Sequence, residues 1–220
     1  MDIGVDESNF SPSLAGDCVV CALIRTGEEV RGVTDSKQLS AKKRLELFTE
    51  LQKSSLYYVV PATPNSISKV NIYLARNIAI ATAITGLLSV ISVDDTFDDK
   101  QFPQKVLIDG YWSKRWLQVF SEATLLEVEG VVRGDETVYE ISAASIVAKV
   151  YCDALFAGWE KLYPEWGIGC DHGSLSDKHL AEIRAKGPSP LHRVGAYGRN
   201  WWEKIFNYGL KRDGTEGTRT

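Results

Sequence analysis

Short apolar runs alternate along this chain with longer stretches of helical period, which predicts strands and helices in succession. The run from Leu14 to Ile24 is apolar on both faces apart from Asp17, so we expect a central strand covered by helices. Gly27-Glu28 suits the two-residue turn of a hairpin after that strand. The predicted strands lie near residues 1–7, 14–26, 29–34, 56–60, 105–109 and 123–129.

Helices are predicted where apolar residues recur every three or four positions. The clearest begins after Ser40, a residue type that caps helix N-termini, and runs to about Lys53 with an apolar stripe that ends at Leu51. Further helices are predicted over about 71–90, 138–163, 176–187 and 198–208.

A hairpin series followed by alternating strands and helices predicts an α/β fold, in which a mixed sheet carries helices on both faces. At 220 residues the chain has the length of one domain. We expect a single catalytic domain over residues 1–208, helical from about residue 165 to residue 208. The polar residues 209–220 are expected to form a flexible tail.

Composition and charge change this picture little. Hydrophobic residues make up 44% and charged residues 25%, as in ordinary globular proteins. The formal net charge of −4 argues weakly against a nucleic-acid partner, because such binders are often basic overall. Binding depends on the local field, and each basic cluster is either a solvated face or a phosphate contact. The clusters are Arg31, Lys37, Lys42, Lys43 and Arg44, and then Lys204, Lys211, Arg212 and Arg219.

No feature of the sequence indicates secretion or a membrane. The N-terminus lacks the basic and apolar regions of a signal peptide, and the stretch Ile78 to Val93 is too short and too rich in Thr and Ser to span a bilayer. Cys18 and Cys21 lie three apart on a predicted strand and so face opposite sides, which favours buried reduced cysteines over a metal site. We therefore expect a cytoplasmic protein with no membrane partner.

Acidic residues stand at the ends of two apolar runs. Asp6 and Glu7 follow the first run, and Asp109 follows another. Strand ends in open α/β sheets are where ligands bind, and clustered carboxylates commonly hold Mg²⁺ or Mn²⁺ against a phosphate. Asp153 lies on a predicted helix whose small residues allow close approach to a sheet, and it shares a helix face with Lys149. This pattern predicts metal-dependent phosphoryl transfer, which nucleases, resolvases and transposases share.

Asp6 and Glu7 are adjacent, which constrains the site. Neighbouring side chains on a strand face opposite ways, so the pair serves one site only if the strand ends there and Glu7 turns back. The turn-forming residues Ser8-Asn9-Phe10-Ser11-Pro12 permit such an end.

A series of blocks from about residue 2 to residue 195 carries a family resemblance. The blocks are Gly4-Val5-Asp6-Glu7, Leu14-Ala15-Gly16, Asp35-Ser36-Lys37-Gln38-Leu39-Ser40 with Lys42-Lys43-Arg44, Asn71-Ile72, Ile108-Asp109-Gly110, Gly134-Asp135, Ala143-Ala144-Ser145-Ile146-Val147-Ala148-Lys149-Val150 with Asp153, Tyr163-Pro164 and Gly187-Pro188-Ser189-Pro190-Leu191-His192-Arg193. Several are long, and in this order they resemble the type 2 ribonuclease H family, ribonuclease HII.

The resemblance implies a ribonuclease H-like fold, with a mixed five-stranded sheet, and hydrolysis of the RNA strand of RNA·DNA hybrids by two Mg²⁺ or Mn²⁺ ions. It carries over Asp6, Glu7, Asp109 and Asp153 as the catalytic metal ligands. The products would be a 3′-hydroxyl and a 5′-phosphate. The implied partner is nucleic acid, and we expect the chain to be a monomer.

Two segments depart from the family pattern. The family follows its Asp-Glu pair with Ala-Gly-Arg-Gly-Pro, which grips 2′-hydroxyls, and this chain has Ser8-Asn9-Phe10-Ser11-Pro12. The family also has Gly-Tyr-Gly-Thr, whose Tyr stacks on the deoxyribose after a ribonucleotide, and this chain has Gly173-Ser174-Leu175-Ser176. Because the 2′-hydroxyl distinguishes RNA from DNA, we expect altered recognition of ribonucleotide junctions.

Two alternative interpretations stay open. The chain could be a nuclease of relaxed or shifted specificity, or a nucleic-acid-binding relative without turnover. The second is disfavoured because the acids are all present. Trp112, close after Asp109, is a candidate for base stacking, although packing in the core is the commoner role of tryptophan. The candidate substrate contacts are Ser8, Asn9, Phe10, Ser36, Lys37, Lys149, His172, Ser174 and Arg193.

Overall fold

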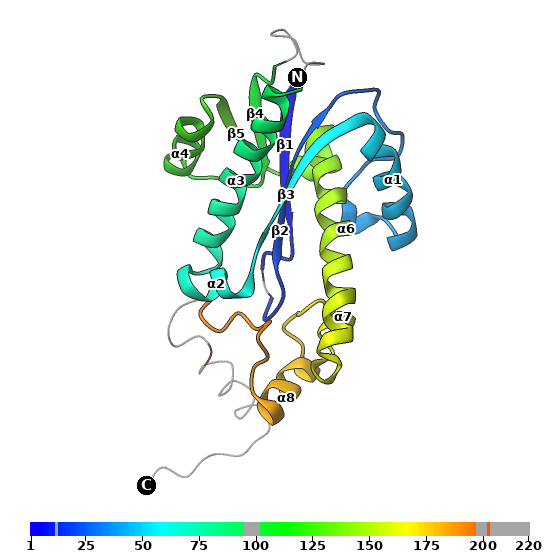
Figure 1. Cartoon of the computed structure of the whole chain (residues 1–220), viewed down its shortest axis with the longest axis vertical. Coiled ribbons are helices and arrows are strands. Elements are labelled where there is room, and N and C mark those ends of the chain that lie inside the picture. Colours follow the sequence, from blue (N-terminus) through cyan, green and yellow to red (C-terminus); the bar gives the residue numbers. More distant parts are fainter. Residues whose placement is uncertain (12, 95–101, 197–201, 203–220) are drawn as a thin grey trace. The chain divides into compact units, whose positions relative to one another are not determined.

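The computed structural model describes residues 1–11, 13–94, 102–196 and 202 (Figure 1). The chain groups into two compact units. We call the first the sheet unit; it comprises Met1–Ser8, Cys18–Pro61 and Arg76–Cys152. We call the second the loop unit; it comprises the described residues of Asn9–Asp17, Ala62–Ala75 and Asp153–Thr220. The expectation of a single domain over residues 1–208 stays a prediction.

The sheet is mixed and five-stranded, in the order β3-β2-β1-β4-β5, which confirms the predicted fold class. β1 pairs antiparallel with β2 and parallel with β4, and β4 pairs parallel with β5. In this register Val5 lies opposite Ile108 and Asp6 lies opposite Cys21. The strands are β1 (Asp2–Ser8), β2 (Cys18–Arg25), β3 (Ser55–Ala62), β4 (Lys105–Asp109) and β5 (Glu127–Val131).

The predicted helices near residues 41–53, 71–90, 138–163 and 176–187 are confirmed, and Ser40 caps the first of them through its side chain. The predicted helix over 198–208 and the tail over 209–220 lie outside the described residues, apart from residue 202. The helices are η1 (Ser36–Gln38), α1 (Ala41–Ser54), α2 (Pro64–Val70), α3 (Ile72–Ser92), α4 (Lys114–Thr124), α5 (Gly134–Thr137), α6 (Tyr139–Leu162), η2 (Pro164–Trp166), α7 (Ile168–Asp171) and α8 (Asp177–Lys186).

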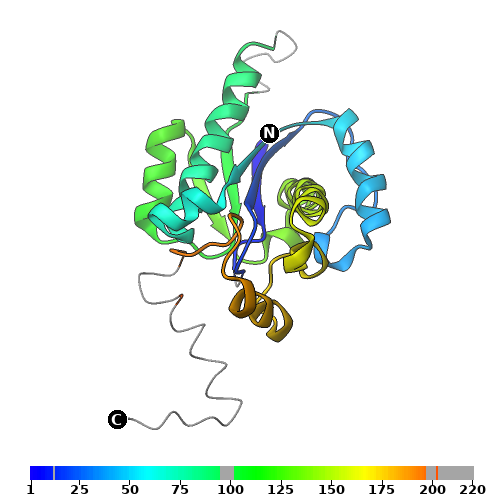
Figure 2. The ribbon, with the colours of Figure 1, turned by 60° about the horizontal axis from the view of Figure 1, so that its bottom comes forward.

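Helices cover both faces of the sheet, with α1 and α6 on one face and α3 and α4 on the other (Figure 2). On the first face, Cys21 and Leu23 of β2 pack against Leu51 of α1 and the small residues of α6. The approach of α6 is close, since a methyl group added at Gly4 would lie 2.1 Å from the backbone carbonyl carbon of Glu140. Glycine on β1 therefore lets α6 lie directly against the strand that carries Asp6.

The hydrophobic pattern misplaced two elements. The predicted strand over 29–34 and the hairpin turn at Gly27-Glu28 are wrong. The backbone N–H groups of Thr26 and Gly27 donate to the carbonyl oxygen of Ser54 at 2.8 and 3.0 Å, so the end of α1 supplies their partner. The predicted strand over 123–129 is also shifted, because α4 runs to Thr124 and β5 begins at Glu127.

Helices α3 and α6 are long and apolar enough, by length and composition alone, to cross a membrane. About half of each is buried inside the protein, 44% for α3 and 56% for α6 in their most apolar windows. Covering a sheet accounts for this apolar character, because helices packed over a buried strand need little polar surface.

Candidate active site

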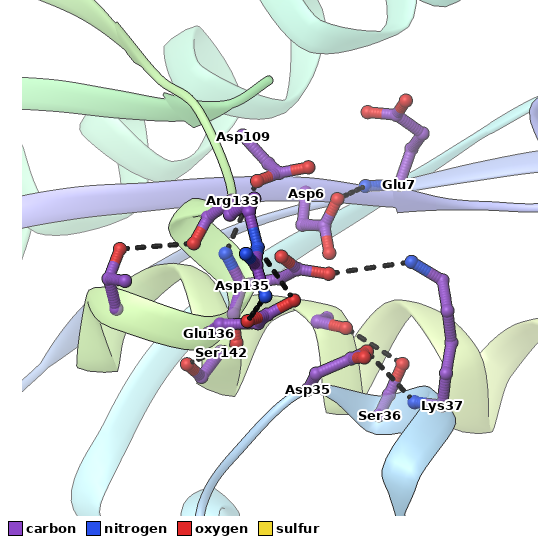
Figure 3. Close-up of polar contacts among 12 residues, drawn as sticks. Asp6, Glu7, Asp35, Ser36, Lys37, Asp109, Arg133, Asp135, Glu136 and Ser142 are labelled. Atoms are coloured by element: carbon purple, nitrogen blue, oxygen red, sulfur yellow. Dashed lines mark hydrogen bonds and ion pairs between the residues drawn. The ribbon is translucent and has the colours of Figure 1, made fainter.

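Three carboxylates of the sheet unit come together beside the ends of two neighbouring strands. Asp6 lies near the end of β1 and Asp109 is the last residue of β4. These strands are parallel, so their carboxyl ends meet at one edge of the sheet. Asp135, in the short helix α5 after β5, donates its backbone N–H to Oδ1 of Asp109 at 3.2 Å (Figure 3). Asp6 and Asp135 are only 5% and 7% exposed.

Burial and mutual repulsion disfavour the charged forms of these acids. Burial raises the pKa of Asp6 well above its usual value, and the nearby charges of Glu7, Asp109 and Asp135 raise it further. Burial also raises the pKa of Asp109, although the N–H groups of Asp135 and Gly134 oppose the shift. Such a cluster is stabilised by a cation placed among its oxygens.

Glu7 faces the other way. β1 continues to Ser8, so the expectation that the strand ends at Glu7 and lets it turn back is wrong. The side chains of Asp6 and Glu7 leave the strand on opposite sides (Figure 3), as alternation on a pleated strand requires. Glu7 Oε1 accepts from Nη1 of Arg76 on α3 at 3.3 Å. Burial raises the pKa of Glu7, and the Arg76 charge opposes the rise.

Arg76 and Trp112 connect the two strand ends. The Arg76 guanidinium carbon lies 4.3 Å from the centroid of the Trp112 ring, a cation–π contact. Trp112 Nε1 donates to the carbonyl oxygen of Asp109 at 2.8 Å. Trp112 is 8% exposed, so it packs in the interior and does not present a stacking surface. Glu7 on β1 and Asp109 on β4 are thereby tied together through two side chains.

A cation also stands on the other side of the acids. Lys37 Nζ lies 3.4 Å from Oδ2 of Asp135, while the Lys37 side chain is 77% exposed. Its backbone is held because Asp35 Oδ1 accepts from the Lys37 N–H at 2.9 Å. Ser36 is buried, and its hydroxyl accepts from Ser145 Oγ at 2.7 Å. Lys37 therefore presents an exposed cation beside Asp135, whereas the Ser36 side chain holds η1 against α6.

The acidic side chains are of the chemical type that binds a divalent metal ion. In the described part of the chain, no three or more His, Cys, Asp or Glu side chains form a ready-made ligand group. The donors present are carboxylate oxygens, the type that Mg²⁺ and Mn²⁺ prefer. Glu7 Oε2 is buried without a hydrogen-bond partner among the described residues, which a cation or water would satisfy.

In the loop unit, the segment that follows Glu7 has a fixed backbone. Asn9 has a φ of 62°, a left-handed conformation that glycine adopts most easily and asparagine next. Its Nδ2 donates to the carbonyl oxygens of Asp17 and Ala15 at 2.9 and 3.2 Å. Asparagine therefore forms here a turn of the kind that glycine adopts most easily.

Arg193 was expected to contact substrate, and the structure gives it another role. Its side chain is fully buried. The guanidinium donates to the carbonyl oxygens of Gly16, Asn9 and Phe10 at 2.7, 2.7 and 3.0 Å. A buried guanidinium with these partners holds the backbone at Asn9, Phe10 and Gly16, and its contact with substrate stays a prediction.

The other candidates of the loop unit group around residues 172–174. Asp153 Oδ1 lies 3.1 Å from Nε2 of His172, whose φ of 53° is also left-handed. Ser174 forms an isolated bridge with Ser13. The ligand role of Asp153 stays a prediction, as do the substrate contacts of Ser8, Phe10 and Lys149.

A buried histidine pair supports this segment. His179 Nε2 lies 3.0 Å from His192 Nε2, and His179 Nδ1 lies 2.9 Å from the carbonyl oxygen of Ser174. His192 Nδ1 accepts from the Ser189 N–H at 2.8 Å, so its Nε2 carries the proton and donates to His179. Burial and the adjacent His179 lower the pKa of His192 to about 4.

Two kinds of site residue have no local signal in the sequence. Asp135 lies within the block Gly134-Asp135, but nothing local places it beside Asp109. Arg76 and the histidine pair carried no motif, and only the packing of distant segments reveals them.

The family model and the curated relatives point to one family, and the solved structures share the fold. The model of the family described as ribonuclease HII matches residues 3–204. The chain is 36% identical over 192 residues to a ribonuclease HII of Vibrio cholerae serotype O1, covering 86% of this chain and 83% of that protein. A solved structure of the PCNA:RNase HII complex from Archaeoglobus fulgidus shares the fold with a TM-score of 0.71 and 24% identity, over 88% of this chain and 94% of that one. Bst-RNase HIII in complex with Mn²⁺ has a TM-score of 0.67 and 17% identity, over 96% and 70% of the two chains.

Proposed function

The chain belongs to the ribonuclease HII family, and we propose that it cleaves the RNA strand of RNA·DNA hybrids with divalent metal ions, Mg²⁺ or Mn²⁺, held by the acids of the sheet unit. As a member of this family it is an endoribonuclease hydrolase of the ribonuclease H type. The observation that carries the proposal is the meeting of Asp6, Asp109 and Asp135 at one edge of the sheet.

We assign Asp6, Asp109 and Asp135 to the metal ions; a metal contact of Glu7, whose side chain leaves β1 on the other side, stays a prediction. Asp135 replaces Asp153 in this assignment, because its backbone N–H contacts the carboxylate of Asp109 and its charge acts on Asp6. Divalent ions held by these residues would supply activation of the attacking water and neutralisation of charge on the phosphate and the leaving oxygen.

The protein residues orient the acids and the substrate. The N–H groups of Asp135 and Gly134 fix the carboxylate of Asp109. The Arg76 guanidinium holds one oxygen of Glu7 and leaves the other without a protein partner among the described residues. Lys37, which is exposed and lies beside Asp135, would contact a phosphate of the substrate strand.

We propose that this chain differs from its family in how it recognises a junction between a ribonucleotide and DNA. Phe10 stands where the family has arginine, and Ser174 stands where it has the stacking tyrosine. The backbone of the first segment forms a glycine-like turn at Asn9. We propose that hybrid cleavage is retained because it rests on the acids, while cleavage at a single embedded ribonucleotide is weakened.

The test is one panel of substrates with Mg²⁺ or Mn²⁺. An RNA·DNA hybrid, a DNA duplex with one embedded ribonucleotide, double-stranded RNA and double-stranded DNA are incubated with the chain and with Asp109→Asn. We expect hybrid cleavage that Asp109→Asn abolishes, and slower cleavage of the single-ribonucleotide duplex.

Other outcomes favour the alternatives. Cleavage of DNA that Asp109→Asn abolishes would support a shifted specificity. Binding without cleavage of any substrate would support a non-catalytic relative. Efficient cleavage at the single ribonucleotide would contradict the altered junction recognition while leaving the metal chemistry intact.

A further inference from the structure

Tyr111 is exposed beside the acids. It lies two residues after Asp109, and 89% of it is exposed to solvent. Two residues of extended chain span about 7 Å at most, so its ring can lie only one to a few nucleotides from a phosphate held at Asp109. Single exposed aromatics are common on protein surfaces, so the exposure needs further support before it indicates a site.

The residues on either side of Tyr111 are anchored. Gly110 has a φ of 91° and donates its N–H to the carbonyl oxygen of Val131 at 2.8 Å. Trp112 donates to the carbonyl oxygen of Asp109 and packs edge-on against Phe120, with ring centroids 5.4 Å apart. Neighbours held on both sides restrict the backbone of Tyr111, so its ring projects into solvent from a fixed position.

Two positively charged residues follow Tyr111 in the sequence. Ser113 caps α4 by accepting from the Trp116 N–H, and the first turn of that helix carries Lys114 and Arg115, both exposed. An exposed aromatic ring beside cations suits a single strand of nucleic acid, since the ring stacks on a base and the cations contact its phosphates. The acids nearby would repel such a strand without these positive charges.

We propose that Tyr111 is a nucleotide-stacking residue, whose ring packs on a base or sugar next to the scissile phosphate, and that Lys114 and Arg115 contact phosphates of the same strand. The inference rests on the proposed function of the acids. Tyr111 would supply an aromatic surface in the sheet unit. This chain has Ser174 where its family has a stacking tyrosine. Tyr111 would thereby help to decide which nucleotides are accepted beside the cleaved bond.

The variants are chosen to separate stacking from folding. Tyr111→Phe keeps the ring, and Tyr111→Ala removes it. Leu125→Ala is the matched control, because Leu125 is 91% exposed at the other end of α4. All are made in the Asp109→Asn background, so that the hybrid substrate stays intact, and their thermal unfolding is compared.

Binding is measured with RNA·DNA hybrids that carry the fluorescent base 2-aminopurine at successive positions. We expect quenching at one position for the parent and for Tyr111→Phe, and no quenching for Tyr111→Ala. We also expect the Kd to rise about tenfold for Tyr111→Ala, in line with the cost of losing one base–aromatic stack. Leu125→Ala should leave both measurements unchanged.

The outcomes distinguish this inference from the function on which it rests. Quenching and Kd unchanged in Tyr111→Ala would overturn the stacking role. A chain without the Asp109→Asn change that cleaves no hybrid would instead overturn the proposed function.

Discussion

The sheet unit and the loop unit differ in how their candidate functional residues are held. In the sheet unit the acids themselves are kept, and the strand register and short backbone contacts place them. In the loop unit the backbone is held by Asn9, Arg193 and the histidine pair, and it carries Phe10 and Ser174, the residues that we propose alter substrate recognition. Catalysis needs particular atoms at the sheet edge. A segment whose backbone is held by buried side chains can change its exposed side chains and keep its conformation.

The largest expected effect tests which acids form the site. Asp135→Asn should lower kcat on an RNA·DNA hybrid more than about a hundredfold, because changes to residues that only support metal ligands already cost about 10–100-fold. Mn²⁺ binding, measured by calorimetry, should weaken in the same variant.

Asp153→Asn is the matched comparison for that experiment. A loss as large as that of Asp135→Asn would place Asp153 among the ligands, as the family resemblance implied. Full activity in Asp135→Asn would contradict its assignment to the metal ions.

The next prediction tests whether Arg193 holds the backbone of the loop unit. Arg193→Met should lower the free energy of unfolding by about 4 kcal/mol, because three carbonyl oxygens lose their donor and each buried unsatisfied group costs about 1–3 kcal/mol. Arg193→Lys should recover only part of this loss, since an ammonium does not reproduce the planar fork of donors. Urea unfolding measures both, and equal stability of the three proteins would show that Arg193 does not hold the segment.

A pH effect of somewhat smaller size is expected from His192. The pKa falls from 6.5 in the unfolded chain to about 4 in the folded protein, a difference of 2.5 units. Below pH 6.5 His192 binds a proton in the unfolded chain but stays neutral in the folded protein. The contribution of His192 to the free energy of unfolding is therefore full above pH 6.5 and is lost as the pH falls toward 4. At about 1.36 kcal/mol per unit the loss is about 3 kcal/mol.

Urea unfolding at a series of pH values measures this loss. His192→Gln has no imidazole to titrate, so its stability should change less over the same range. A parallel pH dependence in the two proteins would assign the acid lability to other groups.

The smallest effect concerns the glycine-like turn. Asn9→Ala should cost about 2 kcal/mol, because alanine is strained at a φ of 62° and the bonds to Asp17 and Ala15 are lost. Asn9→Gly should cost about half as much, since glycine accepts this conformation freely. Thermal unfolding orders the variants, and an Asn9→Ala protein more stable than Asn9→Gly would exclude strain at this position.

Local pattern was sufficient for most elements of the fold. The run before Asp109 predicted β4 over its observed range, and Ser40 predicted the start of α1. The failures occurred where a distant segment supplied the partner. Gly27 looked like a hairpin turn until Ser54, at the end of α1, accepted its N–H.

The sequence by itself determined the family, through the acids at strand ends and the order of the family blocks. Only the tertiary structure decided which groups meet. It brought Asp135 to Asp109, directed Glu7 to Arg76 on the face opposite Asp6, and buried Trp112 while exposing Tyr111. The physical reason is that strand alternation and helix packing act over the whole sheet, and no window of sequence contains both partners of such a contact.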